Sequence, residues 1–134
     1  MIVAELIVLE KQARWAPELQ RQFYDQTVAV RACRDVASLR DRVVAARSSR
    51  KDCVAVLDPA GWPGECLPII SWLRSLKIHV AVVGYPGIEL LEPSLRELGV
   101  TNLILPPIAG HEIGHACRRL LSDDSIQFLR MGTR

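Results

Sequence analysis

Short, continuous apolar runs alternate along this chain with segments whose apolar residues recur at helical spacing. A run without polar alternation is typical of a strand in a sheet that helices cover on both faces, and the helical spacing is typical of an amphipathic helix. The predicted strands are residues 2–9, 27–32, 53–57, 78–83 and 100–105, and the predicted helices are residues 15–24, 35–47, 67–76, 88–98 and 108–121.

This alternation predicts an α/β fold: a single doubly wound domain with a five-stranded parallel sheet, right-handed crossovers and helices on both faces. The domain is expected to cover residues 1–122, and residues 123–134 are expected to form a C-terminal tail. In the fourth predicted helix, Pro93 is expected to kink or divide the helix. Gly99 suits the left-handed position that often follows a helix end.

The composition excludes several classes of protein. Hydrophobic residues make up 49% of the chain and charged residues 24%, which is typical of a globular domain and not of a disordered one. The formal net charge of +2 is too small to indicate nucleic-acid binding, and the cluster of Arg47, Arg50 and Lys51 is expected to be a solvated face. No apolar run approaches the ~18 residues of a membrane span, so no membrane partner is expected.

Two further features predict a cytoplasmic protein. Residues 1–10 contain Glu5 and lack a basic leader and a small-residue cleavage site, so they do not resemble a signal peptide. The four cysteines follow no C-x-x-C spacing and most lie inside apolar patterns; they are Cys33, Cys53, Cys66 and Cys117. They are expected to be buried free thiols in a reducing cytosol.

The third predicted strand, residues 53–57, ends abruptly in Asp58 and Pro59. Proline cannot extend the ladder, so the chain leaves the sheet there and Asp58 lies at the carboxyl end of the strand, where open α/β sheets place their ligand sites. An aspartate before a proline is also a common turn opener. Asp58 is therefore the first candidate site residue, and a purely structural turn is its alternative.

With this pattern the chain resembles the receiver domain of bacterial two-component response regulators, a flavodoxin-like fold with strand order 2-1-3-4-5. The resemblance extends from about residue 2 to about residue 121. It rests on the five strand-helix units, on Val56-Leu57-Asp58, on Pro63 and Gly64 shortly after them, and on Leu105-Pro106-Pro107-Ile108 before the last helix.

The resemblance implies roles for several residues. Receiver domains hold Mg²⁺ with acidic residues after the first strand and with the phosphoacceptor aspartate, and they hold the phosphoryl oxygens with a Ser or Thr after the fourth strand and a Lys after the fifth. By position, Asp58 matches the phosphoacceptor and Glu10 matches the acidic cluster, although Lys11 stands beside it. Glu10 and Asp58 could therefore hold Mg²⁺ weakly, and no other cofactor is expected.

The remaining positions of the family pattern are changed. Val83 or Gly84 occupies the hydroxyl position and Pro106 the lysine position, so the charge-stabilising groups of phosphoryl transfer are missing. The sequence thus favours a degenerate pseudo-receiver: a non-enzymatic signalling module that binds a protein partner or a second copy of itself, as a homodimer, through its last helices and strand. A residual phosphoacceptor that uses Asp58 with Mg²⁺ is the alternative.

A second motif competes with this interpretation. His111-Glu112-Ile113-Gly114-His115 matches H-E-x-x-H, in which two histidines one helical turn apart bind zinc and the glutamate is the general base of a hydrolase. Arg118 and Leu121 stand where an extended zinc motif needs Gly and His, and a later third ligand could only be Asp123, Asp124 or a tail residue. The simpler interpretation is an ordinary fifth helix with the two histidines exposed.

Overall fold

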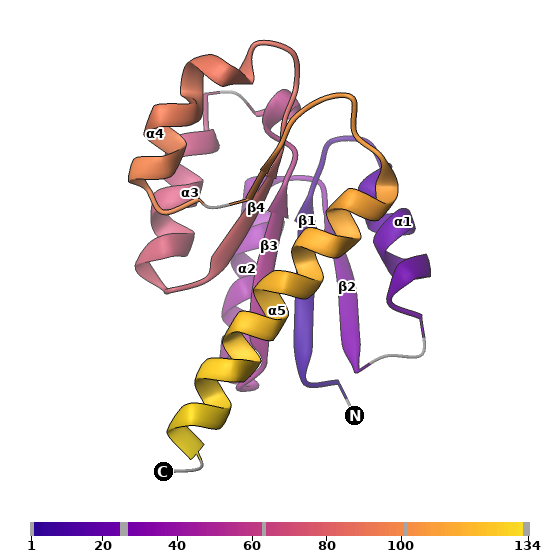
Figure 1. Ribbon diagram of the computed structural model, residues 1–134, viewed down its shortest axis with the longest axis vertical. Coiled ribbons are helices and arrows are strands. Elements are labelled where there is room, and N and C mark those ends of the chain that lie inside the picture. Colours follow the sequence, from indigo (N-terminus) through magenta and orange to yellow (C-terminus); the bar gives the residue numbers. More distant parts are fainter. Residues whose placement is uncertain (1, 25–26, 63, 101, 133–134) are drawn as a thin grey trace.

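The computed structural model describes residues 2–24, 27–62, 64–100 and 102–132, and of residues 122–132 it describes the backbone alone. Its core is one five-stranded parallel sheet in the order β2-β1-β3-β4-β5, which confirms the predicted fold class (Figure 1). The strands are β1 (Ala4–Leu9), β2 (Val28–Cys33), β3 (Asp52–Leu57), β4 (His79–Val83) and β5 (Asn102–Ile104).

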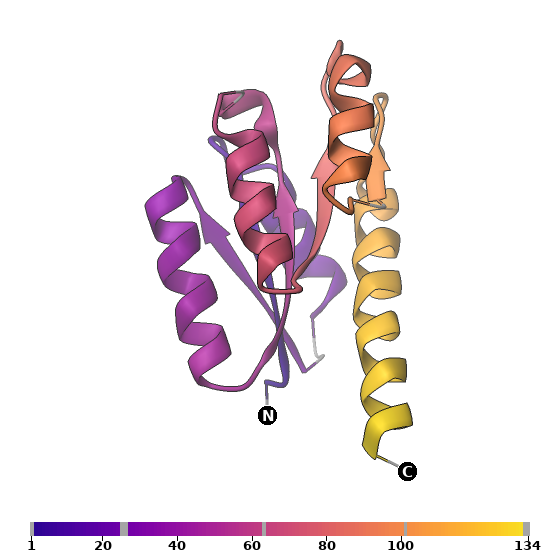
Figure 2. The same ribbon diagram turned by 90° about the vertical axis from the view of Figure 1, so that its left-hand side faces the viewer.

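Helices cover both faces of this sheet (Figures 1 and 2). Buried residues of α1 and α5 pack on one face, and those of α2, α3 and α4 pack on the other. The helices are α1 (Trp15–Gln22), α2 (Val36–Ser48), α3 (Cys66–Ser75), α4 (Glu92–Glu97) and α5 (Gly110–Gly132), with 3₁₀ turns η1 (Pro59–Gly61) and η2 (Ile88–Leu91).

The unbroken apolar runs form strands whose two faces are both buried, as their pattern predicted. In β1, Leu6 and Val8 face the α1–α5 layer while Ile7 and Leu9 face the other layer, so both faces of the strand are buried. All four cysteines are buried and unbridged, as predicted. Burial raises the pKa of the Cys117 thiol to about 12.

Most element boundaries fall within a residue or two of the prediction. The second strand lies one residue later than predicted because Cys33 pairs with Leu9 and prolongs the ladder. The predicted helix over residues 88–98 is divided into η2 and α4, with Pro93 in the first turn of α4, and Gly99 has the expected positive φ of 92°. Two positions used in the predictions, Pro63 and residue 101 of the fifth strand, lie outside the described residues.

The predicted end of the last helix is wrong. Helix α5 does not stop at Leu121 but continues to Gly132 through most of the segment expected to be a tail. The sequence between Gly114 and Gly132 contains neither proline nor glycine, so no residue there interrupts the helical hydrogen bonds. None of the described helices is both long and apolar enough to cross a membrane.

Two glycines allow α5 to lie closely against α1. A side chain at Gly114 would collide with the amide of Gln22, and a side chain at Gly110 would collide with the carboxylate of Glu18. The approach is fixed by hydrogen bonds, since Gln22 Nε2 donates to the Gly110 carbonyl at 2.9 Å and Arg118 Nη2 donates to the Gln22 carbonyl at 3.2 Å. The first turns of α5 are therefore held in place by α1.

Candidate functional site

Asp58 and Glu10 lie next to each other at the carboxyl edge of the sheet. Leu9 and Leu57 are register partners in β1 and β3, so the residues that follow them leave the sheet side by side. The backbone N–H of Asp58 also donates to the carbonyl of Leu9 at 2.9 Å. The structure thus brings together the two acidic residues singled out from the sequence.

Glu10 uses its carboxylate to cap helix α1. Its side chain is buried, and Oε1 accepts the backbone N–H groups of Arg14 at 3.1 Å and Trp15 at 2.9 Å, while Oε2 accepts that of Ala16 at 2.9 Å. A helix start leaves these donors unpaired, and a carboxylate there also opposes the positive end of the helix dipole. Both oxygens of Glu10 are therefore already engaged, and a metal ion would have to share or displace these bonds.

Asp58 is half-buried and caps the start of the 3₁₀ turn η1. Its Oδ1 accepts the backbone N–H of Ala60 at 3.3 Å, which is the turn-opening role that an aspartate before a proline can have. Burial raises the pKa of Asp58 above its usual range, and the nearby charge of Glu10 adds to the rise, while the Ala60 N–H and the charge of Arg14 oppose it. The carboxylate is thus held in surroundings that disfavour its charged form.

A cavity of about 280 Å³ opens beside Asp58, and basic side chains contribute to its wall. Lys11, Gln12, Arg14, Ala60 and Gly61 line it together with Asp58. The Arg14 guanidinium stacks over the Trp15 ring at 4.2 Å, and the buried indole of Trp15 is another group that opposes the rise in the pKa of Asp58. In the sequence Lys11 is evident only as a neighbour of Glu10 and Arg14 gives no signal, because the place of Arg14 on this wall depends on the path of the loop.

The positions that follow β4 and β5 lack the hydroxyl and the lysine that the resemblance to receiver domains implies there. Val83 is buried, and Gly84 donates its backbone N–H to the carbonyl of Ile104 at 2.7 Å. A Cβ at Gly84 would lie 2.8 Å from that oxygen, so the close approach of β4 to β5 requires glycine. Pro106, at the lysine position, is exposed in the loop before α5.

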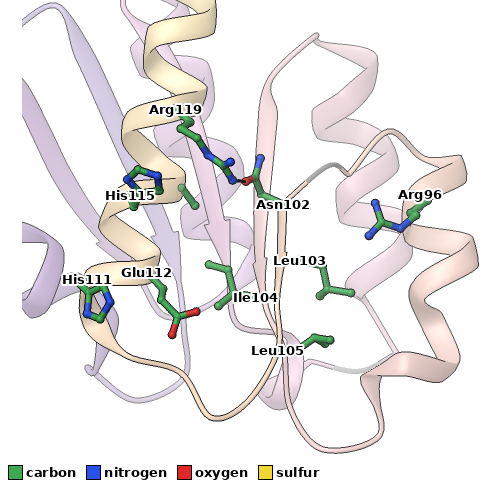
Figure 3. A pocket seen from close by; sticks show the side chains of 10 residues that line it. Arg96, Asn102, Leu103, Ile104, Leu105, His111, Glu112, His115 and Arg119 are labelled. Atoms are coloured by element: carbon green, nitrogen blue, oxygen red, sulfur yellow. Dashed lines mark hydrogen bonds between the residues drawn. The ribbon is translucent and has the colours of Figure 1, made fainter.

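The H-E-x-x-H residues lie elsewhere, on the first turns of α5 (Figure 3). His111, Glu112 and His115 are exposed while Ile113 is fully buried, which is the arrangement expected of an ordinary fifth helix. The side chain of Glu112 accepts the backbone N–H of Ala109 at 3.3 Å and so caps its own helix. Among the side chains that the structure describes, no three metal-ligating groups gather in one place.

These residues border a surface hollow of about 640 Å³, which lies on the face formed by α4, β5 and α5 (Figure 3). Leu103, Ile104 and Leu105 contribute apolar surface to it. Arg96 and Arg119 also line it, and Arg119 Nη2 donates to Asn102 Oδ1 at 2.8 Å.

One charged cluster was missed from the sequence. Glu5 is fully buried in β1, and Arg42 holds its two oxygens with Nε and Nη2, each at 2.9 Å. Lys51 Nζ lies 3.3 Å and Arg31 Nε 3.6 Å from the same carboxylate. The available sequence signal was Glu5, a single acidic residue inside the apolar run of residues 2–9. A charge buried in such a run needs oppositely charged or hydrogen-bonding partners.

Neither a protein-family model nor a curated protein sequence matches this chain. Solved structures do match its fold. The receiver domain of a putative LuxO repressor protein from Vibrio parahaemolyticus gives a TM-score of 0.75 at 14% identity, over 96% of this chain and 97% of that one. The receiver domain of an HD domain-containing protein from Pseudomonas fluorescens Pf-5 gives 0.72 at 15% identity, over 97% and 95%.

A response regulator from Thermotoga maritima gives a TM-score of 0.68 at 16% identity, over 90% of this chain and 99% of that chain. Each of the three comparisons covers at least 90% of this chain and at least 95% of the other chain. The chain therefore has the receiver fold that its sequence pattern resembles.

Proposed function

We propose that this chain, whose fold is that of response-regulator receiver domains, is a non-enzymatic regulatory module that acts by binding protein, and that it is a pseudo-receiver. The observation that carries the proposal is the set of groups around Asp58. Val83, Gly84 and Pro106 stand where the fold's phosphorylated members have a hydroxyl and a lysine, and the oxygens of Glu10 cap α1.

The electrostatics support the same conclusion. Phosphoryl transfer depends on cations and hydrogen-bond donors fixed around the equatorial oxygens. Here the basic side chains beside Asp58, Lys11 and Arg14, are exposed, and Arg14 stacks on Trp15. Cations on the cavity wall also oppose the entry of Mg²⁺, which needs an excess of oxygen ligands and negative charge.

The residual phosphoacceptor is the second candidate function. The observation in its favour is that Asp58 opens directly onto the 280 Å³ cavity, so a small phosphodonor could reach it. In that case Asp58 would be the nucleophile, and Glu10 would help to hold a weakly bound Mg²⁺.

The binding surface proposed is the α4–β5–α5 face with its 640 Å³ hollow. Leu105 is exposed there, and apolar surface beside basic side chains is suited to a protein contact. The proposed occupant is a second copy of the chain, because a two-fold contact across this face would bring the exposed His111 and His115 of both copies together. A cytoplasmic location belongs to the same proposal, and the four buried unbridged thiols support it.

The test is an amide ¹H–¹⁵N spectrum recorded with and without Mg²⁺ and beryllofluoride, a mimic of aspartyl phosphate. The proposal expects an unchanged spectrum. Asp58→Asn is the test variant, and Asp52→Asn, at the opposite end of the same strand, is its matched control.

Shifts centred on Asp58, Glu10 and the adjoining loops would overturn the proposal if Asp58→Asn abolished them and Asp52→Asn preserved them. The residual phosphoacceptor would then be the better description.

A further inference from the structure

The first turns of α5 repeat a pair of residues, Gly110-His111 and Gly114-His115. Residues four apart lie on the same side of a helix, so the glycines form one stripe and the histidines form the next. The glycine stripe faces α1, since a side chain at either position would collide with α1 residues. The histidine stripe is exposed, and its backbone is held by the contact between α1 and α5.

The two imidazoles are placed to act together. Figure 3 shows His111 and His115 on the same side of α5, one turn apart. No hydrogen bond or ion pair within the described part of the chain occupies either ring. Arg119 points away from His115 toward Asn102, to which it donates a hydrogen bond (Figure 3).

We propose that His111 and His115 form half of a zinc site, which the same two histidines of a second copy complete. Imidazole nitrogen suits Zn²⁺, and histidines one helical turn apart can bind a single ion. Zinc in closed protein sites takes four ligands, and the described side chains of one chain bring only two to this place. A two-fold contact across α5 presents the same pair twice, which supplies four nitrogens.

The inference narrows the partner of the proposed regulatory module to a second copy and rests on that module's use of the α5 face. The inference also distinguishes the proposed zinc site from the active site of a zinc hydrolase. In a hydrolase Glu112 would be the general base, whereas here it caps its own helix and plays no part in the zinc link.

The experiment measures mass and zinc content of the untagged full chain by light scattering and metal analysis, with added ZnCl₂ and then with EDTA. We expect a dimer that contains one zinc ion per two chains and that EDTA returns to monomer. His111→Ala and His115→Ala should each weaken zinc binding by about a hundredfold, the order of gain that a second linked ligand provides. Glu112→Gln should bind zinc and dimerise like the original chain.

Three results would overturn the inference: no zinc binding, one zinc ion per monomeric chain, or loss of binding in Glu112→Gln. Because the substituted side chains are exposed, circular dichroism should show every variant folded, so a loss of zinc binding reports on the site. The beryllofluoride test of the proposed function concerns Asp58 and Glu10, which are not part of the zinc site. Its outcome is therefore independent of the zinc result.

Discussion

Substitution of Glu5 by glutamine tests whether the buried charge cluster stabilises the fold. The carboxylate is 0% exposed and accepts two hydrogen bonds from Arg42 at 2.9 Å each, with Lys51 at 3.3 Å and Arg31 at 3.6 Å. Glutamine keeps the shape of the side chain but removes its charge. Its NH₂ group also turns a donor toward a guanidinium that has only donors.

The expected loss of stability is about 3 kcal/mol. Removing one partner of a buried ion pair typically costs ~3–5 kcal/mol, since the remaining charge is left uncompensated. The cations around Glu5 are partly hydrated, with side-chain exposures of 34% for Arg42, 25% for Lys51 and 41% for Arg31, and this places the cost at the lower end. In a domain of this size the melting temperature should fall by about 10 °C.

The loss of stability caused by Glu5→Gln should depend on pH in a defined direction. The hydrogen bond from Arg42 is the main cause that lowers the pKa of Glu5 below the ordinary value of 4.5. A carboxyl group whose pKa is lowered in the folded state contributes its full stabilisation above that ordinary value, and the contribution is lost as the pH falls through the lowered value. The gap between the original chain and Glu5→Gln should therefore narrow in acid.

Urea denaturation of both proteins, near pH 7 and at a series of lower pH values, measures this gap. Glu92→Gln removes an exposed ion pair with Arg96 and serves as the matched control, with a midpoint close to that of the original chain. Equal midpoints of the original chain and Glu5→Gln near pH 7 would refute the reasoning. A gap that stayed constant as the pH was lowered would refute the electrostatic cause.

Gly84→Ala should destabilise the fold by about 1–3 kcal/mol, because the added Cβ would lie 2.8 Å from the carbonyl oxygen of Ile104; Gly64→Ala, with nothing within 4 Å, should leave the urea midpoint nearly unchanged. Asp58→Asn should raise the urea midpoint near pH 7, since the raised pKa of Asp58 means that its charged form weakens the fold. This gain in the urea midpoint should vanish as the pH is lowered past the ordinary aspartate pKa of 3.8. A midpoint of Asp58→Asn equal to that of the original chain near pH 7 would contradict the prediction. The four cysteines should react with a thiol reagent near pH 8 only when the protein unfolds, because all are buried and the pKa of Cys117 is about 12; rapid labelling of the native protein would contradict their burial.

The sheet could be predicted because its signal is local and repeated. Runs such as residues 53–57 are apolar on both sides of the strand, and two helical layers are the ordinary way to bury both sides. Asp58 could be placed for the same reason, since Pro59 forces the chain out of the sheet at that residue. The C-terminal end of helix α5 was harder to predict. A polar segment without proline or glycine can either continue a helix or follow it as a loop.

The side-chain partners of the acidic residues could not be predicted. Glu10 has the same sequence signal whether it holds a metal or caps a helix, and the choice depends on how the loop to α1 turns its N–H groups toward the carboxylate. The partners of Glu5 come from β2, from α2 and from the connection between α2 and β3, and Arg42 is 37 positions away in the sequence. Only the packing of α2 onto the sheet brings that arginine to Glu5.

The close contact between α1 and α5 has an evolutionary consequence. Gly114 leaves room for the amide of Gln22, and Gly110 leaves room for the carboxylate of Glu18, so each glycine and its partner share one limited volume. A side chain at position 114 would force the Gln22 side chain to move and so put at risk its hydrogen bond to the Gly110 carbonyl, and a side chain at position 110 would force the Glu18 carboxylate to move. Among homologous chains, these two pairs should change together.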